Sequence, residues 1–277
     1  MLSHGFVALV DYMGNDAAIV QAARVSYGSG TKTLRDDRGL IRYLMRHRHT
    51  TPFEMVDFKF LVRLPIFVAR QFIRHRMASV NEFSARYSIM SDEFEVPLAE
   101  EVRHQSTQNR QGRGEPLPPE VVDRFRADLE RISREAYLTY SRSLESGVAR
   151  ETARLLLPVS YYTQWYWKSN LWNLFHFLSL RLDPHAQEEI RLYAAEIAAI
   201  ARVVCPVAFD AFEEFELSGV RFSRREQIAL RALLEGQAPE QACARAHLDL
   251  VREDGRPMKT GEGVEFLAKL ERLRQID

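Results

Sequence analysis

A dense group of arginines lies within residues 70–86, where the sequence reads RQFIRHRMASVNEFSAR. Its four arginines face one acid, Glu82, so the segment carries a charge of +3 before His75 is counted (four less one), whereas the whole chain has a net charge of +0. Such a concentration is costly unless anions or acidic partners compensate it. The planar fork of arginine suits phosphate and pyrophosphate better than lysine does. The segment therefore predicts a phosphate site, and its arginines are Arg70, Arg74, Arg76 and Arg86.

Small polar residues separate these arginines, namely Ser79, Asn81 and Ser84. Their tight spacing is typical of a loop that wraps a ligand with hydroxyl, amide and backbone contacts. A solvated basic loop without a ligand is the alternative interpretation of an arginine-rich stretch. Because Ser84 has arginines beside it rather than a base, we expect it to bind a ligand and not to act as a nucleophile.

The order RHRxxSxNxxSxR, from Arg74 to Arg86, resembles the signature of the flavin-dependent thymidylate synthases at all seven specified positions. On these residues the chain is identified as a member of that family. The resemblance spans about residues 1–215. It includes FVALVDYMG at 6–14, HTTPFE at 49–54, PIFVARQ at 65–71, Ala153, Arg154, Leu157, Pro158, Asn170, Arg181 and HAQ at 185–187.

The resemblance implies reductive methylation of dUMP to dTMP, with FAD at a subunit interface of a homotetramer and dUMP stacked on the flavin. It also implies NADPH as the reductant of FAD and 5,10-methylenetetrahydrofolate as the one-carbon donor. The implied dUMP-binding residues are Gln71, Arg74, Glu82, Phe83, Ser84, Ala85, Arg86, Arg154 and Arg181. The implied FAD-binding residues are His49, Thr51, Arg74, His75, Arg76, Glu82, Asn170 and His176.

Several of these residues also have an ordinary structural interpretation. Thr51 can cap a helix, Arg154 can pair with Glu151 on a helix surface, and His176 between two phenylalanines can be a core residue. Arg86 and Arg154 are the residues from which we expect phosphate contacts.

Arg181 matches the family arginine that stabilises the uracil ring as N3 ionises, so it is the catalytic residue that the resemblance implies. A fixed cation beside a developing anion favours the charged form. Asn170 and Arg181 lie about 20° apart on one helical face and about 16 Å apart along its axis, which flavin beside uracil could span.

Two residues depart from the pattern of some family members. Ala85 stands where some have glycine, and its methyl group restricts the backbone near dUMP. Trp172 stands where some have an arginine near FAD, which removes one expected cation.

Cysteine and nucleotide-binding motifs point away from other mechanisms. A thiolate that adds to carbon 6 of uracil would activate carbon 5, but Cys205 and Cys243 both lie far in sequence from the arginine segment. They also lack the spacing of a metal site. The sequence contains no GxGxxG motif, so a Rossmann domain for NADPH is not predicted. We therefore expect NADPH and the folate to compete for one open flavin face.

The expected architecture is α+β: a mainly antiparallel sheet flanked by helices, with a helical C-terminal extension. We assign 1–217 to the catalytic domain and 218–277 to the extension.

Strands are predicted at 56–64, from alternating Val56 to Leu64, and at 161–167, with a short strand-like piece at 94–97. Helices are predicted at 16–25 (ended by Gly28 and Gly30), near 40–45, after a capping box at 51–54, and at 66–76, 119–146, 170–183 and 185–204. In the helix at 119–146 the inward residues are expected to be Val122, Phe125, Leu129, Ile132, Ala136, Tyr140 and Leu144.

The bulk composition narrows the class of protein. Thirty-eight basic residues balance thirty-eight acidic ones, which argues against an extended nucleic-acid surface. No stretch reads as a signal peptide or a membrane span, so we expect a cytoplasmic protein without a membrane partner. The alternatives are a module that binds RNA or a nucleotide without chemistry, and a helix-turn-helix that begins at 222–236. For that segment we favour a helical extension that packs on the tetramer.

Overall fold

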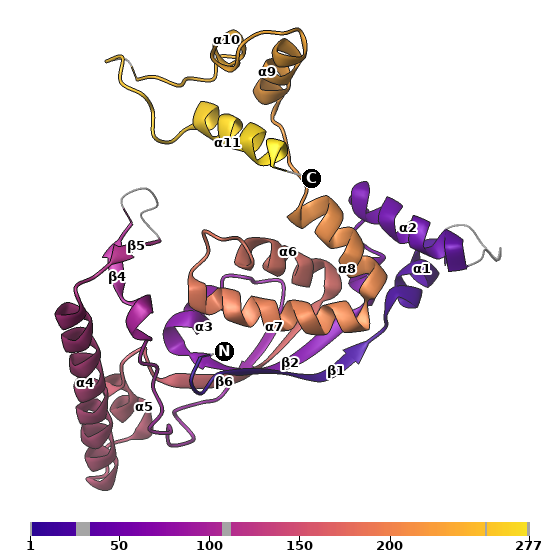
Figure 1. Ribbon diagram of the computed structural model, residues 1–277. Helices are drawn as coiled ribbons and strands as arrows, with labels where there is room; N and C mark the ends of the chain where they lie inside the picture. Colours follow the sequence, from indigo (N-terminus) through magenta and orange to yellow (C-terminus); the bar gives the residue numbers. More distant parts are fainter. Residues whose placement is uncertain (1, 26–33, 107–111, 253, 276–277) are drawn as a thin grey trace. The chain divides into compact units, whose positions relative to one another are not determined.

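The computed structural model describes residues 2–25, 34–106, 112–252 and 254–275 of the chain (Figure 1). The chain divides into two compact units, Met1–Leu217 and Ser218–Asp277. The first unit has an antiparallel sheet flanked by helices and the second is helical, which confirms the α+β class. Gly28 and Gly30, the glycines expected to end the first helix, lie outside the described residues.

Within the described residues, four antiparallel strands form the main sheet in the order β1-β2-β6-β3. They are β1 (Phe6–Met13), β2 (Asp57–Pro65), β6 (Tyr162–Asn170) and β3 (Ser79–Glu82). The predicted strands at 56–64 and 161–167 are confirmed as β2 and β6. The piece at 94–97 contributes only an isolated bridge between Phe94 and Tyr161.

The alternation of fully buried and less buried side chains along β2 explains why this strand lies in the interior of the sheet. Phe58, Phe60, Val62 and Leu64 are fully buried, and they point to the face that the helices cover. The helices on this face are α3 (Ile66–Phe72), α6 (Leu171–Arg181) and α7 (Glu188–Val204), as Figure 1 shows. The helices predicted at 66–76 and 185–204 are shorter in the structure, because α3 ends at Phe72 and α7 begins at Glu188. Pro65 and Gln187 are their N-caps.

A second group of helices packs together beyond β1. It comprises α1 (Asp16–Arg24), α2 (Leu34–Arg46), α8 (Pro206–Phe212) and the π-helical turn Glu213–Leu217. Asn15 caps α1 by accepting from the Ala17 amide at 3.0 Å. Asp16 in turn accepts from the amides of Val207 and Ala208, both at 2.9 Å, and so ties α1 to the start of α8.

The expected capping box at Thr51–Glu54 is wrong. The segment forms only the 3-10 helix Phe53–Met55, which no side chain caps. Val56 follows in extended conformation and leads into β2, so the chain has room for a single turn. Phe53 is buried there, with its ring 6.0 Å from that of Trp172.

Helix α4 (Pro119–Glu145) is confirmed in extent but buries fewer apolar residues than expected. Phe125 and Ile132 are 48% and 50% exposed, whereas Val122, Ser133 and Tyr140 are buried. The reason is that α4 packs on short elements rather than on the main sheet. These elements are the 3-10 helix Ala99–Glu101, α5 (Arg150–Ala153) and the 3-10 helix Arg154–Leu156 (η4). The hairpin β4 (Arg103–Gln105) and β5 (Arg113–Pro116) precedes α4.

The second unit has its own small core. It contains α9 (Arg224–Leu234), α10 (Pro239–Arg245) and α11 (Glu262–Arg274). Alanines of α9 and α10 pack with Cys243, Leu248 and Phe266. Ser223 and Glu226 form a capping box at the start of α9. No helix among the described residues is both long enough and apolar enough to cross a membrane.

Candidate functional site

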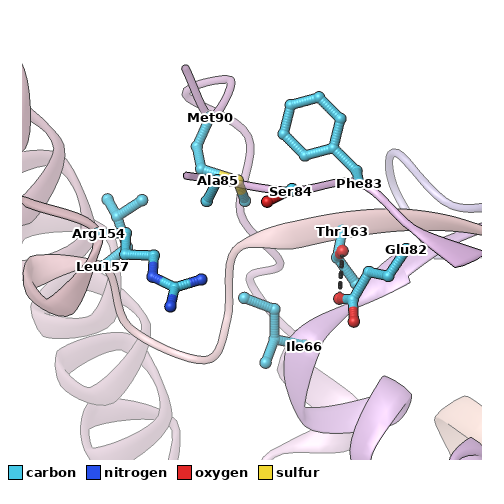
Figure 2. Close-up of a pocket in the computed structure, with 9 residues that line it drawn as sticks. All are labelled: Ile66, Glu82, Phe83, Ser84, Ala85, Met90, Arg154, Leu157 and Thr163. Carbon is cyan, nitrogen blue, oxygen red and sulfur yellow. Dashed lines mark hydrogen bonds between the residues drawn. The ribbon is translucent and has the colours of Figure 1, made fainter. Parts of the chain in front are cut away.

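The first candidate site is a cavity of about 310 Å³ that we call the Arg154 cavity (Figure 2). It lies where the end of β3, the start of β6 and η4 meet. The residues that line it are Ile66, Glu82, Phe83, Ser84, Ala85, Met90, Arg154, Leu157 and Thr163. The cavity thus brings together five of the residues predicted around dUMP, from Glu82 to Ala85 and Arg154.

Strand β3 places the first of these residues. Because β3 is an edge strand paired with β6, the expectation that Ser79 and Asn81 lie in a loop is wrong. Backbone pairing to β6 holds them, and the loop begins only after the Phe83 amide donates to the Gln164 carbonyl at 2.8 Å. The Glu82 carboxylate accepts from the Thr163 hydroxyl at 2.7 Å, so its position is set by the neighbouring strand.

The loop after β3 turns at Ser84 and is anchored at Met90. The Ser84 carbonyl accepts from the amides of Tyr87 and Ser88, both at 3.0 Å. At the far end the Met90 amide donates to the Tyr140 hydroxyl of α4 at 3.2 Å. Ala85 packs against this anchor, and its methyl group lies within the apolar wall of the cavity. The loop therefore holds the Ser84 side chain at the cavity on a braced backbone.

Arg154 enters the cavity from the opposite side. Its Nε donates to the backbone carbonyl of Glu151 at 3.2 Å, and the salt bridges of the described residues do not include the alternative pairing with the Glu151 carboxylate. Figure 2 shows the guanidinium pointing into the space between η4 and the strands. Both terminal nitrogens are without a partner among the described residues. A free guanidinium fork in a concave site can pair with a phosphate through two hydrogen bonds.

The second candidate site is a cavity of about 440 Å³, here the His75 cavity. It lies between the segment that follows α3 and the outer face of α6. Its lining residues are Arg74, His75, Arg76, Met77, Ala78, Trp167, Ser169, Asn173, His176, Leu180 and Arg181. The alternative of a core role for His176 is excluded, because its side chain is exposed at this cavity.

Arg181 is held by two acceptors at the back of this cavity. Its Nε donates to Nε2 of His75 at 3.0 Å, and Nη2 donates to the Gln71 carbonyl at 3.4 Å. Burial lowers the pKa of Arg181. Burial, with Arg181 and His176 nearby, lowers the pKa of His75 to about 4, so the imidazole is neutral at neutral pH.

Two cations at the same cavity have no partner among the residues that the structure describes. Within the described part of the chain, Arg74 and Arg76 form neither a side-chain hydrogen bond nor a salt bridge, and both are exposed. The buried Trp167 adds an indole Nε1 that has no hydrogen-bond partner in the described parts of the chain. Unpaired guanidinium groups beside an aromatic wall fit a ligand with phosphates and a flat ring, and FAD has both.

Other predicted residues line neither cavity. Arg86 lies over the Tyr87 ring, 5.3 Å from its centroid. His49 and Thr51 are exposed on the segment before Phe53. Asn170 caps α6 by accepting from the Asn173 amide at 2.9 Å, which sets the neighbour Asn173 at the His75 cavity.

Gln71 lines neither cavity: its carbonyl accepts from Arg181, and its side chain hydrogen-bonds to Gln187. Thr163 and Asn173 are contributors that the sequence did not single out. The alternation of β6 and the position of Asn170 at the start of α6 carried a signal for both. Trp172 is partly buried against Phe53 rather than placed at the His75 cavity.

Neither cavity contains a thiol that could act as nucleophile. Cys205 is fully buried at the junction of α7 and α8, and burial together with Asp16 raises its pKa to about 12. Cys243 belongs to the core of the second unit.

Comparison with known proteins gives consistent relatives. The family model described as "Thymidylate synthase complementing protein" matches residues 8–207. A flavin-dependent thymidylate synthase of Rickettsia conorii is 50% identical over 250 residues, which cover 86% of this chain and 85% of the relative. One of Ruegeria pomeroyi is 53% identical over 245 residues, with coverage of 87% and 81%.

The solved structures that resemble the chain include a UMP/dUMP methylase, PolB from Streptomyces cacaoi. Its structure with 5-Br dUMP aligns with a TM-score of 0.72 and 39% identity over 78% of this chain and 97% of that chain. Its structure with 5-Br UMP gives a TM-score of 0.70 and 40% identity over 78% and 96%.

Proposed function

The chain belongs to the flavin-dependent thymidylate synthase family, and from this premise we propose that it methylates carbon 5 of dUMP to form dTMP with bound FAD. The observation that carries the proposal is the edge strand β3. The residues before it line the His75 cavity and the residues at its end line the Arg154 cavity, so one rigid element borders two sites suited to anions. We assign this activity to 1–217 and treat 218–277 as a helical extension.

The Arg154 cavity is the proposed site of the dUMP phosphate. Arg154 offers an unpaired guanidinium, and Ser84 offers a hydroxyl from the opposite wall. Glu82 is fixed by Thr163 and accepts hydrogen bonds, so it suits a donor on the sugar or the base rather than the phosphate. Phe83 and Ala85 complete the dUMP site on the loop, and Arg86, which lies over the Tyr87 ring, is the second proposed phosphate contact.

The His75 cavity is the proposed site of FAD. Arg74 and Arg76 would hold its phosphates, while His176 and the Asn170 cap would contact the flavin. His49 and Thr51 are proposed on the flavin or folate side. When bound, FAD supplies the reducing equivalents that complete the methyl group, after NADPH has reduced it and 5,10-methylenetetrahydrofolate has donated the carbon.

Among the protein's own residues, Arg181 is the one to which we assign a role in the chemical step. Three of its N–H groups have no partner in the described chain, since Nε and one N–H of Nη2 are engaged by His75 and Gln71. These donors can stabilise negative charge on the uracil ring as N3 ionises, which makes carbon 5 more nucleophilic. The buried, protonated thiol of Cys205 supports a route without a covalent cysteine adduct.

A homotetramer with shared active sites is part of the proposal. Apolar side chains left exposed on α4, such as Phe125 and Ile132, support burial of this helix against another copy. Light scattering during size exclusion should give a mass of four chains, and activity should fall on dilution to the monomer. A fully active monomer would contradict the tetramer.

Tritium release from carbon 5 of labelled dUMP tests the reaction. We expect release and dTMP formation with FAD, NADPH and 5,10-methylenetetrahydrofolate, and none without FAD. Purified protein that is colourless and cannot be reconstituted with FAD would instead favour a module that binds nucleotides without chemistry.

UMP is a second candidate substrate, because the similar PolB structures are described as a UMP/dUMP methylase. The same assay with labelled UMP separates the two. Relatives at 50% and 53% identity are named thymidylate synthases, so we expect a clear preference for dUMP.

A further inference from the structure

The contact between His75 and Arg181 joins two residues that lie 106 positions apart. Nε of Arg181 is the donor, so Nε2 of His75 is the acceptor, at 3.0 Å. A ring nitrogen can accept only when it carries no proton, which requires the neutral tautomer protonated at Nδ1. The contact therefore specifies both the charge and the tautomer of His75.

We propose that His75 is a positioning residue for Arg181, which orients the guanidinium toward the uracil ring rather than serving mainly as a ligand of FAD. The proposal rests on the proposed function for the role of Arg181, and it deepens that function at the same site. Nε donates to His75 and Nη2 donates to the Gln71 carbonyl, so two hydrogen bonds along one edge of the guanidinium restrain its rotation. The other edge, with Nη1, stays open to a ligand.

The surroundings of His75 favour this neutral acceptor. The ring is partly buried against Phe177, with centroids 4.9 Å apart, and the His176 ring lies 6.0 Å away. The charged and titratable groups that act on it are Arg181 and His176, and burial is the largest cause of its lowered pKa. An imidazolium here would face the Arg181 guanidinium at hydrogen-bond distance, with no carboxylate among the groups that shift its pKa. Protonation would therefore break the contact and release the guanidinium.

Nitrogen-15 NMR of the histidine side chains tests the contact itself. In the full-length protein loaded with FAD, His75 should show an unprotonated Nε2 and a protonated Nδ1 from pH 8 down to about pH 5. The assignment comes from the signal that is lost in His75→Leu. If His75 instead titrates near its ordinary pKa of about 6.5, the contact is absent and the proposal fails. This result is independent of whether the protein methylates dUMP.

Kinetics and FAD affinity test the role. His75→Leu should lower kcat/KM for dUMP by about tenfold or more, while the FAD dissociation constant changes by less than about threefold. In an Arg181→Ala background the same substitution should have almost no further effect, because the two residues act as a unit. His75→Gln, whose amide oxygen can accept near the position of Nε2, should recover most of the activity.

His47→Leu is the matched control, because His47 lies at the end of α2 against Tyr43, outside both cavities. It should leave kcat/KM unchanged. Two outcomes overturn the proposal: a loss of FAD affinity in His75→Leu as large as the loss of kcat/KM, or losses in the double variant that multiply. If no variant and no wild-type sample turns over dUMP, the proposed function fails while the NMR result still decides the contact.

Discussion

Replacement of Arg154 by alanine is the perturbation that most directly tests the Arg154 cavity. The guanidinium projects into the cavity from η4, and Nε donates to the Glu151 carbonyl, while both terminal nitrogens have no partner among the described residues. Removing it takes away the cation that the proposal assigns to the phosphate of dUMP. Since the side chain is exposed and makes no tertiary hydrogen bond in the described chain, we expect the fold to be unaffected.

The expected magnitude follows from one charge-assisted pair. Hydrogen bonds to charged groups contribute about 1.5 to 3 kcal/mol, and each 1.4 kcal/mol changes an equilibrium constant about tenfold. The dUMP dissociation constant of Arg154→Ala should therefore rise about 10- to 100-fold. Arg154→Lys keeps the charge but loses the planar fork, so it should lie between wild type and alanine.

Isothermal titration calorimetry of the FAD-loaded protein, at constant salt, measures these constants. Deoxyuridine, which lacks the phosphate, should bind wild type and Arg154→Ala equally. Arg142→Ala is the matched control, because Arg142 also donates its Nε to a backbone carbonyl a few residues earlier but lies on α4 outside the cavity. The reasoning is refuted if dUMP binding is unchanged, or if deoxyuridine binding weakens as much as dUMP binding.

Four further predictions follow from the same structure. Asn170→Ala removes the cap of α6 and should reduce stability by about 0.5 to 2 kcal/mol in chemical denaturation, and an unchanged midpoint would exclude a capping role. Because the folded pKa of His75 is lowered to about 4, the unfolded chain binds more protons between there and about pH 6.5, so stability should fall as the pH drops through that window. Urea unfolding at pH 7 and pH 5 should show a smaller acid loss in His75→Leu, and an equal loss would contradict the lowered pKa. Cys205→Ala should keep turnover, since this thiol lies outside both cavities, and abolished activity in a folded variant would revive a cysteine mechanism. Truncation after Leu217 should leave a folded first unit without altering any DNA affinity, and DNA binding that vanishes with the extension would support the helix-turn-helix alternative.

Local pattern was enough for much of the fold. The alternation of Phe58, Phe60 and Val62 predicted β2, and the helices predicted at 16–25 and 170–183 are α1 and α6. These features depend on residues within a few positions of each other, so a single segment contains the whole signal. The sequence failed where a distant partner decides, as at Ser79 and Asn81, which β6 draws into a strand.

Helix α4 shows the same limit for burial. Its period of apolar residues is genuine, but periodicity does not say how much surface the neighbours supply. Only Val122 and Tyr140 of the expected inward residues are fully buried, because α4 meets short elements instead of the main sheet.

The sequence by itself determined the arginine-rich signature for anionic ligands and the alternation that builds the sheet. Only the structure removed the cysteines from consideration, because Cys205 is buried outside both cavities. Only the tertiary structure decided which residues meet. Arg154 faces a loop some seventy positions earlier, and Arg181 finds its acceptor 106 positions away on the segment after α3. The physical reason is that β6 pairs with both β2 and β3, and this pairing, which no local pattern encodes, aligns the arginine segment with η4 at one end and α6 at the other.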